Sequence, residues 1–249
     1  MIQLKNVHKR FGDLVVLDGV DFEVRRGETV ALLGPSGTGK SVLLKHMNGL
    51  LRPDSGTVTV DGMDVPNLSR RDLAKLRSHI GYVFQFGALF DSMTVFENIR
   101  LGITDGDCAT DKDYCRFRVL ECLDLVNLPR DTVAKFPDEL SGGMKKRVGL
   151  ARAIAGNPTY LLYDEPTTGL DPVNADIIDK LVEKLQDELG VTSVMVTHDV
   201  RGSFSVADRV ALLSGGTIHA MGTPQELLAS TDGAVREFLE RDLGGAFVT

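Results

Sequence analysis

The sequence predicts an α/β protein with a mainly parallel core sheet, an antiparallel β portion near the N-terminus and an inserted helical lobe. Apolar strand patterns alternate with helical patterns in the first and last parts of the chain, whereas the middle lacks strand patterns. The length of 249 residues suits a single domain spanning residues 1–249. We expect a core lobe formed by residues 1–86 and 157–249, and a helical lobe formed by residues 87–156.

The first part of the chain is predicted to form short strands separated by turns. The run from Thr29 to Gly34 is apolar throughout, as in strands that are buried on both faces of a parallel sheet. A helix follows from Lys40 to about Leu50. Patterns typical of strands also occur at Gln3–Val7, Gly19–Val24, Thr57–Val60, which precedes an Asp61-Gly62 turn, and Ile80–Phe84.

Helical periodicity dominates from about Gly87 to Gly156. Apolar side chains recur there at helical spacing, as at Phe117, Val119, Leu120, Leu123 and Val126. This change of pattern predicts the inserted lobe.

Strands and helices alternate again in the last part of the chain. Asp171 as N-cap and Pro172 at the first helical position predict a helix that Gly190 closes. Thr223 opens a capping box, and a final amphipathic helix follows. Strands are predicted at Tyr160–Asp164, Thr192–Thr197 and Val210–Leu213.

Composition and charge exclude several classes of protein. The net charge of −7 and pI near 5.3 argue against a nucleic-acid binder, because phosphate neutralisation needs a basic excess. We expect the one basic run, Lys145–Arg147, to be a solvated helix face. The N-terminal residues show no secretion signal, and no stretch approaches the roughly 18 apolar residues of a membrane span. We therefore expect a cytoplasmic chain.

The three cysteines, Cys108, Cys115 and Cys122, lie seven residues apart. On a helix, seven residues advance the chain by about 10.5 Å. Thiolates that share a zinc ion, each at about 2.3 Å, must lie much closer together. We expect small buried side chains rather than metal ligands, and the odd number in a reducing compartment predicts no disulfide framework.

A glycine-rich loop lies between a buried strand and a helix, which is the context of a phosphate-binding loop. Its backbone N–H groups can face phosphate oxygens, and the helix N-terminus favours an anion. We expect Lys40 to reach the β- and γ-phosphates of ATP and the Ser41 hydroxyl to bind Mg²⁺. The loop consists of Gly34, Pro35, Ser36, Gly37, Thr38, Gly39, Lys40 and Ser41.

Polar side chains end the neighbouring strands. Asp164 is expected to hold the magnesium shell, and Glu165 to orient and partly deprotonate the attacking water. Ligands bind α/β sheets at the carboxyl ends of the strands, so His198 is expected to contact the γ-phosphate and hold the water. Gln85 can reach the metal or the water. Phe11 can stack on adenine, although core packing is as good an interpretation for this residue alone.

The segment LSGGM predicts a second anion-binding site. Ser141 is a natural N-cap, and Gly142 and Gly143 allow a ligand to approach the backbone closely. The positive end of the following helix would point outward. Because the chain has only one phosphate loop, this site serves either its own nucleotide or that of another copy.

Five motifs together resemble the ATP-binding subunits of ABC transporters across essentially the whole chain. They are GPSGTGKS, LSGGM, YLLYDE, TGLD at 168–171 and the VTHD around His198. The resemblance implies that two copies dimerise head to tail, with each ATP between Lys40 of one copy and Ser141, Gly142 and Gly143 of the other. It also implies that Asp171 lies near the dimer seam, that Gln85 couples the site to a membrane permease, and that Val16 and Val42 lie beside the nucleotide.

The region after Gln85, LSGGMKKRVGLARAIA and AVREFL resemble the Mla-type ATPases, with Asp91 and Ser92 as the most specific detail. This implies a cassette on the cytoplasmic face of the inner membrane, an Mce-domain partner, and transport of phospholipid or another lipid. A cassette for import of a small polar solute, such as an amino acid, is the alternative.

Two rival classes use similar motifs. A soluble P-loop phosphotransferase would use Lys40 identically, but it would leave LSGGM and the Glu165–His198 pair without a role. A mechanical cassette of DNA repair or translation usually carries long coiled coils or two cassettes per chain, and neither occurs in this sequence.

Overall fold

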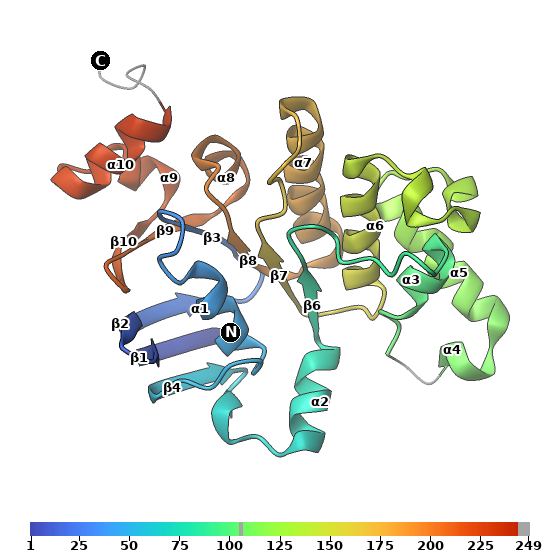
Figure 1. Ribbon diagram of the computed structural model, residues 1–249, viewed down its shortest axis with the longest axis horizontal. Helices are drawn as coiled ribbons and strands as arrows, with labels where there is room; N and C mark the ends of the chain where they lie inside the picture. Colours follow the sequence, from blue (N-terminus) through green and yellow to red (C-terminus); the bar gives the residue numbers. More distant parts are fainter. Residues whose placement is uncertain (105–106, 244–249) are drawn as a thin grey trace. The chain divides into compact units, whose positions relative to one another are not determined.

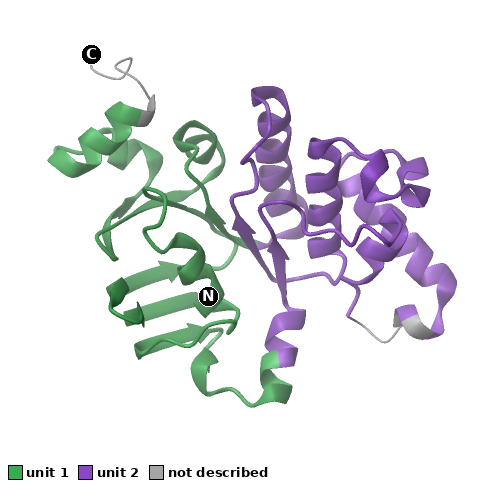
Figure 2. Ribbon diagram, in the orientation of Figure 1, with its two compact units in different colours: residues 1–73, 192–249 green, residues 74–191 purple. Residues whose placement is uncertain are grey.

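A computed structural model describes residues 1–104 and 107–243 of the chain. They form two compact units, residues 1–73 with 192–249 and residues 74–191 (Figure 2). The division at residue 73 falls within α2 (Arg70–Ser78), a helix that the sequence patterns did not indicate. The predicted division into a core lobe and a helical lobe stays a prediction.

The first unit begins with an antiparallel sheet in the order β2-β1-β4-β5; Figure 1 labels β2, β1 and β4. Its strands are β1 (Ile2–Phe11), β2 (Leu14–Val24), β4 (Ser55–Val60) and β5 (Met63–Asp64). Ile2 pairs with Val24 on one side and with Val60 on the other, and all three are fully buried. The antiparallel N-terminal β portion is thus confirmed, with the first two strands longer than predicted because their hairpin pairing continues to Phe11 and Leu14.

The same unit contains the mainly parallel strands β3 (Thr29–Leu33), β8 (Thr192–Val196) and β9 (Arg209–Ser214). β3 pairs in parallel with both β8 and β9, and all five residues of β3 are buried, as predicted from its apolar run. An antiparallel edge strand, β10 (Thr217–Gly222), follows β9 and was not predicted. Its residues are mostly half-buried and lack a strong apolar alternation.

Helices of the first unit are short. α1 (Lys40–Met47) begins where predicted and ends earlier than the predicted Leu50. A 3-10 turn, η1 (Val65–Asn67), follows β5. α8 (Val200–Val206) was not predicted, whereas α9 (Pro224–Leu228) has the predicted capping box at Thr223. α10 (Gly233–Leu243) packs against α8 and α9.

The second unit holds the parallel strands β6 (Ile80–Val83) and β7 (Tyr160–Asp164), and otherwise helices. No strand occurs between β6 and β7 in the described residues, so the helical character of this region is confirmed. α7 (Pro172–Leu189) starts at the N-cap Asp171 and ends at Gly190, as predicted. The remaining elements are α3 (Val95–Arg100), α4 (Asp107–Thr110), α5 (Lys112–Leu125), η2 (Arg130–Ala134), η3 (Pro137–Glu139) and α6 (Gly142–Ile154).

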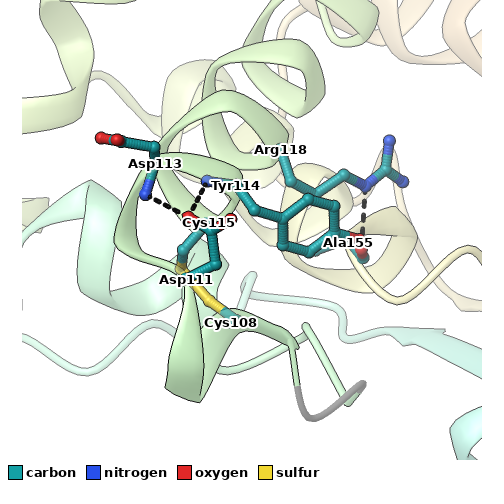
Figure 3. Close-up of a disulfide and its surroundings, with 7 residues drawn as sticks. All are labelled: Cys108, Asp111, Asp113, Tyr114, Cys115, Arg118 and Ala155. Atoms are coloured by element: carbon teal, nitrogen blue, oxygen red, sulfur yellow. Dashed lines mark hydrogen bonds between the residues drawn. A yellow bond between two sulfur atoms is a disulfide. The ribbon is translucent and has the colours of Figure 1, made fainter.

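The cysteine prediction is partly wrong. All three cysteines are buried, but a disulfide joins Cys108 to Cys115, with their Cα atoms 4.6 Å apart (Figure 3). The helical-rise argument failed because the two residues lie on different helices. Asp111 ends α4 with an extended backbone and caps α5 by accepting from the N–H groups of Asp113 and Tyr114. Cys122 is a buried free thiol whose pKa is raised to about 12 by desolvation.

Candidate nucleotide-binding and hydrolysis site

The predicted phosphate loop links β3 to α1, and two of its glycines pack closely against neighbouring strands. Gly34 and Gly39 have φ of 152° and 101°, which L side chains rarely adopt. A Cβ at Gly34 would lie 2.3 Å from the backbone oxygen of Leu213 on β9, and one at Gly39 would lie 2.7 Å from Cγ1 of Val16 on β2. These two positions therefore require glycine, whereas the loop tip at residues 35–37 is exposed.

Lys40 lies inside this loop. Its ammonium donates to the backbone oxygens of Gly34 and Pro35 at 2.7 and 3.1 Å, and the residue is only 6% exposed. The Thr38 hydroxyl also donates to Pro35 O, at 2.8 Å. A phosphate entering the loop would thus compete with carbonyls for the ammonium. Ser41 and Val42, both half-buried, follow in the first turn of α1.

The other predicted residues of the first unit lie on its strands. His198 follows β8, which pairs in parallel with β3, so His198 and the phosphate loop share one sheet edge. Its neighbour Asp199 caps α8 by accepting from Gly202 N at 3.0 Å. Phe11, 46% exposed, ends β1 with the Lys9 ammonium 5.4 Å from its ring centroid. Phe11 is therefore not a core residue, and its exposed ring can accept a stacking partner.

The second unit places Gln85 and Asp164 together. β6 and β7 are parallel with Val83 opposite Tyr163, so both residues lie at the carboxyl edge of this strand pair. The Tyr82 hydroxyl donates to Asp164 Oδ2 at 2.9 Å. Desolvation and the Asp164 charge raise the pKa of Tyr82, which stays a neutral donor. The sequence patterns did not indicate Tyr82 as a site residue. The available signal was a hydroxyl-bearing side chain on β6, a strand predicted to end at the same sheet edge as Asp164.

Glu165 begins a tight turn after β7, in a left-handed conformation with φ of 54°. The Thr168 hydroxyl donates to Glu165 Oε2 at 2.7 Å. Beneath the turn, the Lys146 ammonium donates to the backbone oxygens of Pro166 and Thr168 at 2.7 and 2.5 Å. The carboxylate is thus held by a turn that is itself fixed from α6.

The expectation that Lys145–Arg147 forms a solvated face is wrong at Lys146, which is 7% exposed. Burial lowers the pKa of Lys146 to about 8, while the Glu165 charge acts in the opposite direction. Lys146 shares one face of α6 with Gly143 and Leu150, and all three residues are buried.

The predicted second anion site is the start of α6. Ser141 is the N-cap, as predicted, and its hydroxyl accepts from Met144 N at 3.3 Å. Ser141 and Gly142 are exposed, and a Cβ at Gly142 would meet nothing within 4 Å. Gly143 is buried, and a Cβ there would lie 2.6 Å from Asn174 Oδ1 on α7.

Asp171 lies beside this site through Asn174. Asp171 Oδ1 accepts from the N–H groups of Val173 and Asn174, and its Oδ2 accepts from Asn174 Nδ2 at 2.5 Å. These hydrogen bonds, foremost that of the Asn174 side chain, lower the pKa of Asp171. Asn174 was not predicted as a site residue, but it fixes the starts of α6 and α7 against each other.

A family model described as ABC transporter matches residues 17–168, a range that includes the phosphate loop, the α6 start and both carboxylates. The chain belongs to the ABC transporter family. It is an ATPase of this family, of the ATP-binding subunit type. Among the described residues, no helix is long and apolar enough to cross a membrane.

Similar proteins include a lipid transport subunit and two importer subunits. The chain is 39% identical over 98% of its length to the intermembrane phospholipid transport system ATP-binding protein MlaF of Haemophilus influenzae, of which it covers 92%. It is 42% identical over 88% of its length to the methionine import ATP-binding protein MetN of Carboxydothermus hydrogenoformans. It is 43% identical over 92% to the sulfate/thiosulfate import protein CysA of Bradyrhizobium diazoefficiens, and covers 65% of each importer subunit.

Solved structures share the fold. A dimeric post-hydrolysis structure of the ATP-binding cassette MJ0796 bound to ADP and Pi has a TM-score of 0.79 and 35% identity, covering 90% of this chain and 99% of that one. The structure of cbiO1 from Clostridium perfringens, part of the ABC transporter complex cbiONQ, has a TM-score of 0.82 and 32% identity, over 97% and 95% of this chain and that one. The predicted cassette fold is confirmed.

Proposed function

We propose that two copies of this chain dimerise head to tail around two ATP molecules, and that hydrolysis drives lipid transport through a membrane permease. The observation that carries this proposal is the start of α6, which presents an N-cap serine and a bare glycine to solvent rather than to its own unit. The dimeric form of the similar cassette MJ0796 supports the formation of a dimer.

In this dimer, the phosphate loop and Lys40 of one copy would bind the ATP phosphates. Ser141, Gly142 and Gly143 of the second copy would donate to the same nucleotide from the positive end of α6. Phe11 would stack on the adenine, with Val16 and Val42 beside it. His198, at the same sheet edge as the loop, would contact the γ-phosphate.

The donor set fits magnesium. Ser41, Gln85 and Asp164 offer a hydroxyl, an amide and one carboxylate, which are the oxygen ligands that Mg²⁺ takes alongside substrate phosphates. Among the described residues no group of three or more His, Cys, Asp and Glu side chains could hold a metal ion. The proposed set has one carboxylate and would bind Mg²⁺ together with the phosphates of ATP. When bound, the ion would neutralise charge on the phosphates.

Glu165 would act as the general base. Its Oε2 accepts from the Thr168 hydroxyl, and the carboxylate held in this way would accept the proton of the attacking water. Such a base contributes about 10² to 10⁴ in rate. The left-handed backbone at Glu165 is a conformation that surrounding contacts must maintain, as is common where a functional side chain is aimed.

Exposed aromatic rings after β6 support a docking surface for the membrane permease. Phe84, Phe86 and Phe90 are 42%, 75% and 53% exposed. Two side chains hold the segment that carries them. Arg152 donates to the oxygens of Gly87 and Ala88, and Asn98 bonds both backbone groups of Phe90. The rings are thus displayed from a fixed loop rather than a loose one.

Similarity over nearly the full length of both chains supports phospholipid as the cargo. The Mla-type motifs add an Mce-domain protein at the inner membrane as a proposed further partner. The identity to MetN and CysA, 42% and 43%, favours a second candidate, import of a small polar solute. Purification of the cassette from its own membranes decides between them. Co-purified phospholipid supports the first, and a solute-binding protein in its place supports the second.

The dimer is tested by Glu165→Gln. The matched control is Glu183→Gln, at an exposed position of α7. We expect Glu165→Gln to bind ATP, to lose turnover by about 10² or more, and to elute as a dimer in ATP. A monomer at saturating ATP would contradict the shared site. Ser141→Arg should also abolish turnover, and loss of ATP binding in the isolated chain would instead assign this helix to its own nucleotide.

A further inference from the structure

We propose that Lys146 is a positioning residue that couples the start of α6 to the carboxylate of Glu165. This inference rests on the proposed function, in which Glu165 serves the nucleotide of its own chain and Ser141–Gly143 serve that of the second copy. It adds a physical connection between the two sites.

The first step is the turn that carries Glu165. The chain leaves β7 at Asp164, and Pro166 and Thr167 are buried immediately after Glu165. The Lys146 ammonium, which comes from α6, donates to the backbone oxygens of Pro166 and Thr168 and so fixes two points of this turn. Hydrogen bonds from a charged donor are shorter and stronger than neutral ones.

The second step runs from the turn to the carboxylate. Thr168, whose carbonyl Lys146 holds, donates its hydroxyl to Glu165 Oε2 at 2.7 Å. A displacement of the Thr168 backbone therefore displaces the donor that orients the carboxylate. The path from ammonium to carboxylate contains two hydrogen bonds and a single residue.

The third step links Lys146 to the signature glycines. Lys146 is one helical turn from Gly142 and lies on the same face as Gly143. Gly143 packs against Asn174, which binds Asp171, and Gly149 on the next turn packs against Gly87 so closely that a Cβ would lie 2.9 Å from its Cα. These contacts hold α6 on two sides, and the Lys146 hydrogen bonds tie it to the Glu165 turn.

The consequence is communication between the two ATP sites. When the α6 start of one copy engages the nucleotide of the other, Lys146 transmits the position of α6 to the turn of its own Glu165. Each copy then aims its base for hydrolysis once its signature segment is engaged. Because each occupied site sets the base of the other through Lys146, the cooperativity of turnover in ATP measures this connection.

The test compares Lys146→Met with Lys145→Met in the full chain. Lys145 is the adjacent lysine of the same helix, is half-buried, and has no side-chain hydrogen bond or ion pair within the described residues. We expect Lys146→Met to lower kcat by about tenfold to a hundredfold, the range for a misplaced catalytic group, with the KM for ATP within about twofold. The Hill coefficient for ATP should fall toward 1. Lys145→Met should keep all three values.

Lys146→Gln separates loss of the hydrogen bonds from a folding defect, because its amide can still donate to one of the two carbonyls. We expect a partial recovery of kcat relative to Lys146→Met. Thr168→Val, which removes the hydroxyl but no carbonyl, should lower kcat similarly, and the double variant with Lys146→Met should lose little more, because both act on one path.

Two results would overturn the inference: a folded Lys146→Met with unchanged kcat and Hill coefficient, or losses from Lys146→Met and Thr168→Val that multiply independently. Failure of the proposed function is distinguishable from either. In that case Glu165→Gln itself retains turnover, whereas failure of the inference alone leaves Glu165→Gln inactive and Lys146→Met active.

Discussion

The phosphate loop and the Glu165 turn are both short connections after a buried parallel strand, yet they are held differently. The phosphate loop is positioned by its backbone, because Gly34 and Gly39 touch neighbouring strands where no side chain fits. The Glu165 turn is positioned by side chains: Lys146 reaches it from α6, Thr168 bonds Glu165 within the turn, and Tyr82 on β6 holds the preceding residue, Asp164. Backbone-built sites are visible as glycine patterns, whereas side-chain-built ones require the tertiary structure.

Gly34→Ala tests the backbone-built region and has the largest expected effect. The new Cβ would meet the Leu213 carbonyl, a backbone atom that cannot rotate away, at a φ that alanine disfavours. We expect the free energy of unfolding to fall by about 3 kcal/mol or more, with loss of ATP binding. Chemical denaturation and nucleotide titration measure both.

Gly12→Ala is the control for Gly34→Ala. Gly12 has φ of 59°, but a Cβ there would meet nothing within 4 Å. The loss should be only the roughly 1 kcal/mol of a strained φ. Equal losses at the two positions would show that close packing is not what holds the phosphate loop.

Reduction of the Cys108–Cys115 disulfide tests a covalent side-chain tie in the second unit. The bond closes a short loop between α4 and α5, so breaking it should lower the free energy of unfolding by about 2 kcal/mol. Thermal unfolding with and without reductant measures this loss. Cys115→Ser should show no dependence on reductant, and a dependence equal to that of the natural chain would contradict the pairing.

Tyr82→Phe tests one hydrogen bond of the region that is positioned by side chains. Removing the phenol leaves Asp164 without this donor, at a cost of about 1 kcal/mol. We expect the Mg²⁺ concentration for half-maximal turnover to shift by a few-fold while ATP binding by the phosphate loop is unchanged. An unchanged Mg²⁺ dependence would mean that the phenol supports packing only.

Gly142→Ala has the smallest expected effect on stability. Unlike the other variants, it should raise the free energy of unfolding. A Cβ there is free of contacts, and alanine favours a helix over glycine by up to about 1 kcal/mol. Turnover should nevertheless fall, because the methyl group faces the nucleotide of the second copy in the proposed dimer. A stabilised variant with full turnover would contradict that arrangement.

The sequence predicted most of the fold because local signals agree with it. The apolar run of β3, the caps of α7 and the capping box of α9 all lie where expected. β10 and α8 were missed because their apolar patterns are weak. The cysteine prediction failed because it assumed one continuous helix across Asp111.

For the candidate site, motif spacing placed the loop and the carboxylates at strand ends. It could not identify Tyr82, Lys146 or Asn174, since their roles arise from contacts across 82, 20 and 31 residues of chain, to Asp164, Pro166 and Gly143. A basic run is usually solvated, and only the burial of one face of α6 separates Lys146 from its two neighbours.

The rigid display of Phe84, Phe86 and Phe90 has a consequence for biogenesis. Arg152 and Asn98 hold the backbone of this loop at Gly87, Ala88 and Phe90, so the loop keeps its shape and Phe86 and Phe90 stay exposed when no permease covers them. A cassette synthesised in excess over its permease would therefore keep an exposed apolar patch that favours aggregation. Balanced production of the two subunits would limit this aggregation.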